Sequence, residues 1–405
     1  MSDINTFLNN ATSKGISMGL DTMRSLTTAL GNPQNKPKHI IHIAGTNGKG
    51  SVGAFIEYAL ISAGYSVGRY SSPAVFSRFE VFKKNGICIT ESEYLEYMDK
   101  IQSVAEATPT IFEAETALAF LWFEDCDYCI IEAGLGGRLD ATNVIDDKKT
   151  AVLTSISLDH MNILGNSLEA IAAEKCGIFN PNTQIISTDQ VQSVKDVIIS
   201  KAKSLHLKFS DKPQNIHFDS EYQAFDYKDL QNIKISLLGS FQPTNAALAI
   251  EVLQALDVSE EHIRKGLENT IWHGRFDIIS RSPMIIADGA HNRKAFSELA
   301  KSLKAYFPNT KFTFVTGVLA DKEYTEAARI LSPLAERVFT ITPDNARALN
   351  NEDYAAEFKK HGIDAIPTTL SEIYNIADKD KITVVFGSLS FMKTLFNEVN
   401  NGKNR

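Results

Sequence analysis

The sequence predicts an α/β fold with mainly parallel sheets, divided between two domains. Three observations predict it. Short apolar runs alternate with amphipathic stretches along the chain. A glycine-rich turn separates the first apolar run from the first helical pattern. The 405 residues also exceed the ~100–200 residues of one usual domain.

The first apolar run, Ile40 to Ile43, predicts a strand, and helically spaced apolar residues from Val52 to Ala63 predict the helix that follows it. Three more strands are expected in this part of the chain, at Ser66 to Tyr70, Tyr128 to Ile131 and Ala151 to Ser155. Ligands of open α/β sheets bind beyond the carboxyl ends of the strands, so we look for a site in the turns after these runs.

A second series of strands begins after Asn269 to Arg275, an irregular stretch that we interpret as the interdomain connection. Its strands are expected at Met284 to Ala287, Lys311 to Thr316, Arg337 to Ile341 and Ile382 to Phe386, with helical patterns such as Ala295 to Tyr306 between them. The predicted domains are residues 1–273 and 274–405, and the second has a usual domain size.

Composition excludes several classes of protein. With 43% apolar and 22% charged residues the chain should fold, and a net charge of -8 disfavours nucleic acid as a partner. No apolar run approaches the ~18 residues that span a bilayer, so no membrane partner is expected. Met1 to Gly19 lacks the pattern of a secretory signal, and four cysteines make no disulfide framework, so we expect a cytoplasmic location. We interpret Cys126 and Cys129 as structural rather than as a redox or zinc pair.

The strongest functional signal is Gly45-Thr46-Asn47-Gly48-Lys49-Gly50-Ser51, between the first strand and its helix. Glycines let the backbone wrap a phosphate, lysine adds positive charge, and a serine hydroxyl can bind Mg²⁺. The spacing departs from the usual P-loop because Gly50 separates the lysine from the serine. The context of strand, turn and helix favours a phosphate site over a glycine-rich turn without a ligand.

Other polar residues follow the predicted strands of the first domain. Glu132 ends an apolar strand, where a nucleotide site commonly keeps an anchor for Mg²⁺, and the Gly134 to Gly137 run lets a ligand approach. Asp159-His160 follows the next strand, and from its spacing His160 is equally a ligand or a structural residue. Lys175 precedes a glycine stop, and its simplest role is to cap a helix C-terminus electrostatically.

In the second domain Asp288-Gly289-Ala290-His291-Asn292 directly follows an apolar strand. Asp288 and His291 can bind a charged ligand or an amine, or they can form a local Asx turn with a neutral histidine. Arg275 lies in the connection, where a guanidinium can reach phosphates.

These motifs together resemble the folylpolyglutamate synthase and dihydrofolate synthase family, which is related to the Mur peptide ligases. The matching blocks run over nearly the whole chain: Gly19 to Asp21, Leu30 to Gln34, Ala44 to Ser51, Ser71 to Pro73, Phe112-Glu113, Thr116-Ala117, Glu132 to Asn143, Leu158 to His160, Ile171 to Lys175, Gln242, Asn245-Ala246, Gly274-Arg275, Asp288 to Asn292 and Gly317 to Lys322.

The resemblance implies a P-loop, Mur-ligase-like central domain and a smaller, Rossmann-like C-terminal α/β domain. It implies Mg²⁺ held by Ser51, Glu132 and His160, a carbamylated Lys175 that organises the metals, and a K⁺ site whose ligands we do not place. It also implies nucleotide contacts from Asn245, Arg275 and Asp288, contacts to the incoming substrates from Ser72, Pro73, Asp288 and His291, and catalytic roles for Lys49, His160 and Lys175.

The activity that the resemblance implies is ATP-dependent addition of L-glutamate to dihydropteroate or a reduced folate, through an acyl phosphate, by a monomeric enzyme. Some residues depart from the family pattern: Ala74-Val75, Val81, Phe241 and Arg293. The nucleotide and metal positions are intact while the loop on the folate side, at Ala74, is altered, so a related ligase with another carboxylate acceptor stays an alternative. A nucleotide-binding regulator without turnover is disfavoured because Lys49, Glu132 and His160 are all retained.

Overall fold

The computed structural model describes residues 4–203 and 205–402. It divides into two compact units. Unit 1 comprises Met1–Gln214, Phe225–Lys234 and Thr244–Thr270, and unit 2 comprises Asn215–Ala224, Ile235–Pro243 and Ile271–Arg405. Among the described helices, none combines the length and the apolar character needed to cross a bilayer.

Unit 1 is built on an eight-stranded sheet of order β4-β3-β2-β5-β1-β6-β7-β8. The six strands from β2 to β8 in this order run parallel, and β3 and β4 form an antiparallel edge. The strands are β1 (His39–Ala44), β2 (Val67–Tyr70), β3 (Phe82–Lys84), β4 (Ile87–Cys88), β5 (Tyr128–Glu132), β6 (Thr150–Leu153), β7 (Gln184–Ser187) and β8 (Leu207–Phe209). The α/β fold and the four strands expected in this region are therefore confirmed.

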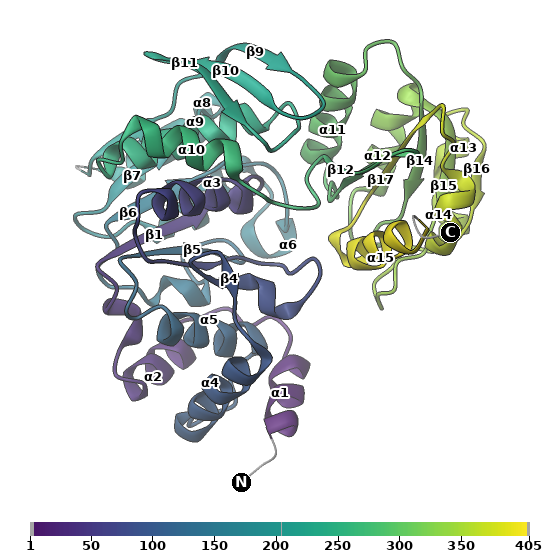
Figure 1. The fold of residues 1–405 in the computed structure, drawn as a ribbon. Helices are drawn as coiled ribbons and strands as arrows, with labels where there is room; N and C mark the ends of the chain where they lie inside the picture. Colours follow the sequence, from purple (N-terminus) through teal and green to yellow (C-terminus); the bar gives the residue numbers. More distant parts are fainter. Residues whose placement is uncertain (1–3, 204, 403–405) are drawn as a thin grey trace. The chain divides into compact units, whose positions relative to one another are not determined.

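Helices cover both faces of this sheet. Figure 1 shows α2 (Asp21–Ala29), α4 (Glu91–Val104) and α5 (Ile111–Trp122) on one face and α3 (Lys49–Ser62) and α10 (Glu260–Asn269) on the opposite face. Both α4 and α5 begin at a capping box, in which a threonine and a glutamate three residues later exchange hydrogen bonds with main-chain N–H groups. Covered faces explain why the central strands read as continuous apolar runs.

The P-loop helix α3 and helix α10 pack with their main chains in contact. A Cβ atom on Gly266 of α10 would lie 2.3 Å from Cα of Ala59 in α3. Only glycine fits at this position, because any side chain there would force the two helices apart.

The remaining elements before residue 270 connect or flank the sheet. The helices are α1 (Ile4–Ser13), α6 (Met161–Leu164), α7 (Leu168–Lys175), α8 (Gln192–Ala202) and α9 (Gln242–Ala255). A separate three-stranded sheet of order β11-β10-β9 contains β9 (Gln214–Phe218), β10 (Gln223–Tyr227) and β11 (Leu230–Ile235). This sheet was not predicted from the sequence.

Unit 2 contains a six-stranded sheet of order β12-β13-β17-β14-β15-β16. Its strands are β12 (Asp277–Arg281), β13 (Met284–Asp288), β14 (Phe312–Thr316), β15 (Ala335–Thr340), β16 (Ala365–Pro367) and β17 (Ile382–Phe386). Only β12 runs antiparallel to its neighbour. The helices are α11 (Arg293–Tyr306), α12 (Tyr324–Leu331), α13 (Asn351–Lys359), α14 (Ile373–Ile376) and α15 (Met392–Gly402). The predicted strands are present, whereas β12 and β16 were not predicted.

Candidate active site

The glycine-rich turn lies between β1 and α3, as its sequence context predicts. Gly45 and Gly48 both have positive φ values, of 153° and 92°. A Cβ atom would lie 1.8 Å from Oγ1 of Thr154 at Gly45 and 2.5 Å from Oδ1 of Asn245 at Gly48. Asn245, on α9, therefore lies directly against the turn, and both glycines are required by close approach as well as by conformation.

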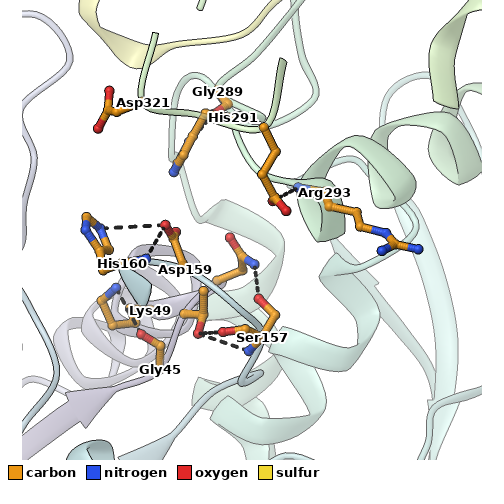
Figure 2. A network of polar contacts seen from close by, with 12 residues as sticks. Gly45, Lys49, Ser157, Asp159, His160, Gly289, His291, Arg293 and Asp321 are labelled. Carbon is orange, nitrogen blue, oxygen red and sulfur yellow. Dashed lines mark hydrogen bonds and ion pairs between the residues drawn. The ribbon is translucent and has the colours of Figure 1, made fainter. Parts of the chain in front are cut away.

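Residues 154–157, which follow β6 and which we call segment 154–157, hold the glycine-rich turn from one side. The N–H groups of Thr46 and Asn47 donate to the carbonyl oxygen of Ser155. The hydroxyl of Thr46 donates to the carbonyl of Ser157 and accepts from its N–H, and the amide of Asn47 donates to the hydroxyl of Ser157. Figure 2 shows Ser157 at the centre of these contacts. The side chains of Thr46 and Asn47 are thus used to fix the turn.

Lys49 is the first residue of α3, and its ammonium group points back over the turn (Figure 2). Its Nζ donates to the carbonyl of Gly45 at 3.3 Å and lies 3.6 Å from Oε1 of Glu132. Ser51 is buried in the first turn of the same helix, and Glu132 is buried at the end of β5. The predicted residues Lys49, Ser51 and Glu132 are thus placed around one helix N-terminus, which favours anions.

Lys175 reaches the same turn from α7. It is only 5% exposed, and its Nζ donates to the carbonyl of Gly45 at 2.9 Å. Burial, the largest cause, and repulsion from Lys49 together lower the pKa of Lys175 to about 7, against the opposing effect of Asp159 and Asp140. Helix capping alone, the simplest interpretation of the sequence, is therefore wrong for this residue, because its ammonium group is buried against the glycine-rich turn.

Two glycines allow α7 to approach the loop after β5. A Cβ atom on Gly137 would lie 2.8 Å from the carbonyl oxygen of Lys175, and one on Gly177 would lie 2.4 Å from Cα of Arg138. Asn143 donates to the carbonyl of Gly177 at 3.0 Å. The end of α7 is therefore held close to the loop that carries Gly134 to Gly137, which explains how Lys175 is positioned.

His160 occupies a left-handed conformation, with φ of 50°, before the short helix α6. Its N–H donates to Oδ1 of Asp159, and its Nε2 lies 3.9 Å from the same oxygen (Figure 2). The side chain is 45% exposed. In the described ranges, no three side chains of histidine, cysteine, aspartate and glutamate come together as a metal-binding group.

The oxygen donors near the turn nevertheless suit Mg²⁺. Ser51 offers a hydroxyl and Glu132 a carboxylate, and Mg²⁺ is usually held by one or two carboxylates together with substrate phosphates. This donor set fits an ion that arrives with a nucleotide better than one held by protein alone.

Asp140 is a residue of this site that the analysis of spacing missed. Its Oδ2 accepts from the N–H of Leu135 at 2.7 Å, and its Oδ1 accepts from the N–H and the hydroxyl of Thr142. Thr142 Oγ1 in turn lies 2.8 Å from Nε2 of buried His42. Burial raises the pKa of the Asp140 carboxyl. An aspartate two residues before a threonine, at the end of a glycine-rich loop, is the local signal that predicts such an Asx turn.

The predicted acceptor residues Ser72 and Pro73 follow β2, and Pro73 is exposed. The preceding Ser71 is buried and accepts a hydrogen bond from Arg69, which pairs with Glu57 of α3 at 2.6 Å. The buried arginine and glutamate thus join the start of this loop to the P-loop helix.

The part of this loop that departs from the family pattern has its own internal bonds. The carboxylate of Glu80 accepts from the N–H groups of Val75 and Phe76. The altered residues at Ala74 and Val75 therefore lie in a loop that Glu80 closes on itself.

In unit 2, Asp288 ends β13 and is buried. Its two oxygens accept from the N–H groups of Phe276 and Ala290, at 2.8 and 2.7 Å, and burial raises the pKa of its carboxyl. Nδ1 of His291 lies 2.8 Å from the carbonyl oxygen of Gly289, to which it donates. The local Asx turn that the sequence allows is therefore formed, and ligand binding by Asp288 and His291 stays a prediction.

Arg275 lies against the same turn within unit 2. A Cβ atom on Gly289 would be 2.4 Å from Nη1 of Arg275, which donates to the carbonyl of Gly274. Asn292 caps α11 by accepting from the N–H of Ala295, and Arg293 pairs with Glu326 at 3.1 Å. The substitution at Arg293 is accommodated by this surface pair.

Comparisons with known proteins assign both halves of the chain. Residues 43–253 match the Mur ligase middle domain, and residues 274–389 match the glutamate ligase domain of Mur ligases. A dihydrofolate synthase/folylpolyglutamate synthase of Bacillus subtilis is 34% identical, with 97% of each chain covered. One of Escherichia coli is 36% identical over 78% of this chain and 76% of its own length.

Solved structures agree with these relatives. The folylpolyglutamate synthase of Mycobacterium tuberculosis, complexed with ADP and AMPPCP, has a TM-score of 0.87 at 27% identity and covers 97% of this chain and 99% of its own. E. coli FolC in complex with DHPP and ADP also has a TM-score of 0.87, at 30% identity, and covers 99% of this chain and 97% of its own.

Proposed function

The chain belongs to the folylpolyglutamate synthase/dihydrofolate synthase family of the Mur ligases, and from this premise we propose that it is an ATP-dependent ligase that joins L-glutamate to a pterin or folate carboxylate. The partners that this function requires are small molecules: ATP, L-glutamate and either dihydropteroate or a reduced folate. A monomeric state and a cytoplasmic location stay predictions.

The observation that carries the proposal is the arrangement around Gly45 and Gly48. Lys49 and Lys175 both donate to the carbonyl of Gly45, and Asn245 lies against Gly48. The cation of Lys49 at this helix N-terminus, with the main-chain N–H groups there, forms an environment for the terminal phosphates of a nucleotide. The turn is already fixed by segment 154–157, so little reorganisation is needed when the nucleotide binds.

The proposed reaction has two steps, and the protein stabilises charge in both. An oxygen of the acceptor carboxylate forms a bond to the γ-phosphorus while the bond to the β–γ bridging oxygen breaks, which gives an acyl phosphate and ADP. The α-amino group of L-glutamate then forms the amide bond, loses a proton and displaces phosphate. Lys49 neutralises the charge that develops on the transferred phosphoryl group.

Ser51, Glu132 and His160 would hold Mg²⁺ in this scheme. When bound, the ion offsets the negative charge of the phosphates and orients them. Lys175 would contribute as a carbamate: CO₂ adds to a neutral amine with loss of a proton, and the lowered pKa of about 7 supports that modification near neutral pH. A K⁺ ion is part of the same proposal, with no ligands assigned.

We assign the nucleotide and amino acid contacts of unit 2 to the turn after β13. Asp288 would act mainly by holding the turn, since both of its oxygens accept main-chain hydrogen bonds. Donation from Nδ1 of His291 to the Gly289 carbonyl leaves its Nε2 in the acceptor form when the ring is neutral. Such an acceptor suits an incoming amine. Arg275 would supply a cation for a phosphate.

A second candidate function differs only in the acceptor. The loop closed by Glu80 includes the altered residues Ala74 and Val75, and it directly follows the predicted acceptor residues Ser72 and Pro73. A ligase that joins an amino acid to another carboxylate would retain the ATP site and change this loop. The altered loop therefore concerns the identity of the acceptor and leaves the ATP-dependent chemistry as proposed.

The experiment that tests the proposal is phosphate release from ATP with a panel of acceptors. We expect release only when L-glutamate and either dihydropteroate or a reduced folate are both present, with a glutamylated product detected by mass spectrometry. Release that ignores either substrate would contradict the proposal. Turnover with another carboxylate alone would support the second candidate function instead.

A further inference from the structure

The side-chain amide of Gln190 completes the hydrogen bonding of segment 154–157. Its Nε2 donates to the carbonyl of Thr154 at 2.9 Å, and its Oε1 accepts from the N–H of Ile156 at 3.2 Å. These two peptide groups flank Ser155. A primary amide that both donates and accepts in this way takes the place of a peptide group on a neighbouring strand.

The position of Gln190 explains why a side chain is needed there. Strand β7 pairs with β6 in parallel, and the ladder ends where the N–H of Thr188 donates to the carbonyl of Leu153. Beyond that point the chain turns toward α8, which begins at Gln192. On this side segment 154–157 would lack a hydrogen-bonding partner from the main chain, and the side-chain amide of Gln190 takes its place.

The opposite side of the same segment holds the glycine-rich turn. The carbonyl of Ser155 accepts from Thr46 and Asn47, and the hydroxyl of Ser155 donates to the carbonyl of Asn47 at 3.2 Å. Segment 154–157 is therefore bonded to Gln190 on one side and to the turn on the other. The chain then continues within three residues to His160.

We propose that Gln190 is a positioning residue for the phosphate turn and for His160, which acts through its two hydrogen bonds to segment 154–157. The inference rests on the proposed function, because it assigns the turn to nucleotide binding. Loss of the amide would release the segment and let Thr46 and Asn47 shift. Displacements near 1 Å in a site of this kind can cost about 10²-fold in rate.

The test compares three variants. Gln190→Met keeps the length of the side chain and removes both hydrogen bonds, Gln190→Ala also removes the packing, and Gln192→Ala is the matched control. Gln192 is an exposed glutamine whose amide donates to Asp196 within α8. ADP affinity is measured by calorimetry, KM and kcat by steady-state kinetics, and Tm by thermal unfolding.

We expect Gln190→Met to weaken ADP binding and to raise KM for ATP by about 10-fold or more, with KM for L-glutamate within about twofold of wild type. Its Tm should stay within a few degrees of the wild-type value, and Gln192→Ala should match the wild type in every measurement. Gln190→Ala should resemble Gln190→Met in KM for ATP.

The inference would be overturned if Gln190→Met had the ADP affinity and the KM for ATP of the wild type. It would also be overturned if the KM values for ATP and for L-glutamate rose equally while Tm fell. Calorimetry separates this result from a failure of the proposed function. A wild-type protein that binds ADP but does not join glutamate to any acceptor would refute the ligase assignment, while the effect of Gln190 on ADP binding would still be measurable.

Discussion

The ammonium group of Lys175 donates a hydrogen bond of 2.9 Å to the carbonyl of Gly45, which lies 130 residues earlier in the chain. Lys175 is buried beside the glycine-rich turn and near a second lysine, Lys49, and burial together with this repulsion lowers its pKa to about 7. An ordinary lysine, with a pKa near 10.5, is almost entirely protonated at neutral pH. A much larger fraction of Lys175 is therefore a neutral, reactive amine at neutral pH.

We predict that Lys175 is carbamylated and that the fraction of carbamylated Lys175 rises as the pH increases from 6 to 8. CO₂ adds only to the neutral amine, and the neutral fraction increases as the pH passes the pKa of about 7. ¹³C NMR with labelled bicarbonate measures the carbamate directly. Lys175→Arg should lose both the signal and turnover.

The matched control for that measurement is Lys201→Arg, a change at an exposed lysine in the last turn of α8. It should retain the carbamate signal and activity. A fully active enzyme in which Lys175 is unmodified would refute the prediction.

Lys49→Met should lower kcat by at least about 10²-fold, because it removes the cation that neutralises charge on the transferred phosphoryl group. ADP should still bind, more weakly, since the glycine-rich turn keeps its contacts with segment 154–157. Steady-state kinetics and calorimetry check the two effects separately. Lys36→Met, at a surface lysine paired with Glu124, is the control, and an unchanged kcat in Lys49→Met would contradict the assigned role.

Gly48→Ala should reduce nucleotide affinity strongly, whereas Gly64→Ala should not. Both glycines flank α3 with similar φ values, 92° and 87°, so each substitution brings backbone strain of about 1–2 kcal/mol. Only at Gly48 would the methyl group also collide with Asn245, while nothing lies within 4 Å at Gly64. The Tm of each variant reports the backbone strain, and ADP affinity measured by calorimetry reports the displacement of Asn245. Equal ADP affinities would contradict the collision.

The stability of the protein should fall as the pH decreases from about 6.5 to 4. Burial lowers the pKa of His39 to about 4 and lowers that of His42 well below its usual value. The unfolded chain therefore takes up protons first as the pH falls, so the stability that the neutral histidines contribute above pH 6.5 is lost.

The variant that tests this is His39→Gln, which removes the titrating group next to Thr150 and should flatten the decline in Tm between pH 6.5 and 4. His217→Gln, at an exposed histidine, is the control and should leave the profile unchanged. A profile that is identical in wild type and His39→Gln would exclude His39 as a cause.

The strands were predictable because they are buried on both faces, which leaves continuous apolar runs such as Ile40 to Ile43. The glycine-rich turn was predictable because its function requires particular residues at adjacent positions. Strands such as β12 and those of the three-stranded sheet were not, because they are partly exposed and carry mixed side chains: in β9 every residue is at least partly exposed.

Contacts that depend on the fold could not be predicted from local spacing. The burial of Lys175 results from close approach of Gly137 and Gly177 to segments far along the chain, and its sequence alone favoured a helix cap. The two bonds of Gln190 exist only because β7 ends one strand away from segment 154–157. A glutamine in a polar stretch carries no local sign of such a role.

The contact of Gly266 with Ala59 makes the outer surface of unit 1 relevant to its chemistry. Because the main chains of the two helices meet at this point, a methyl group added at residue 266 would push apart α10 and the helix that starts at Lys49. Substitution at residue 266 is therefore expected to disturb the proposed nucleotide site from a distance, without altering any residue that we assign to substrate binding.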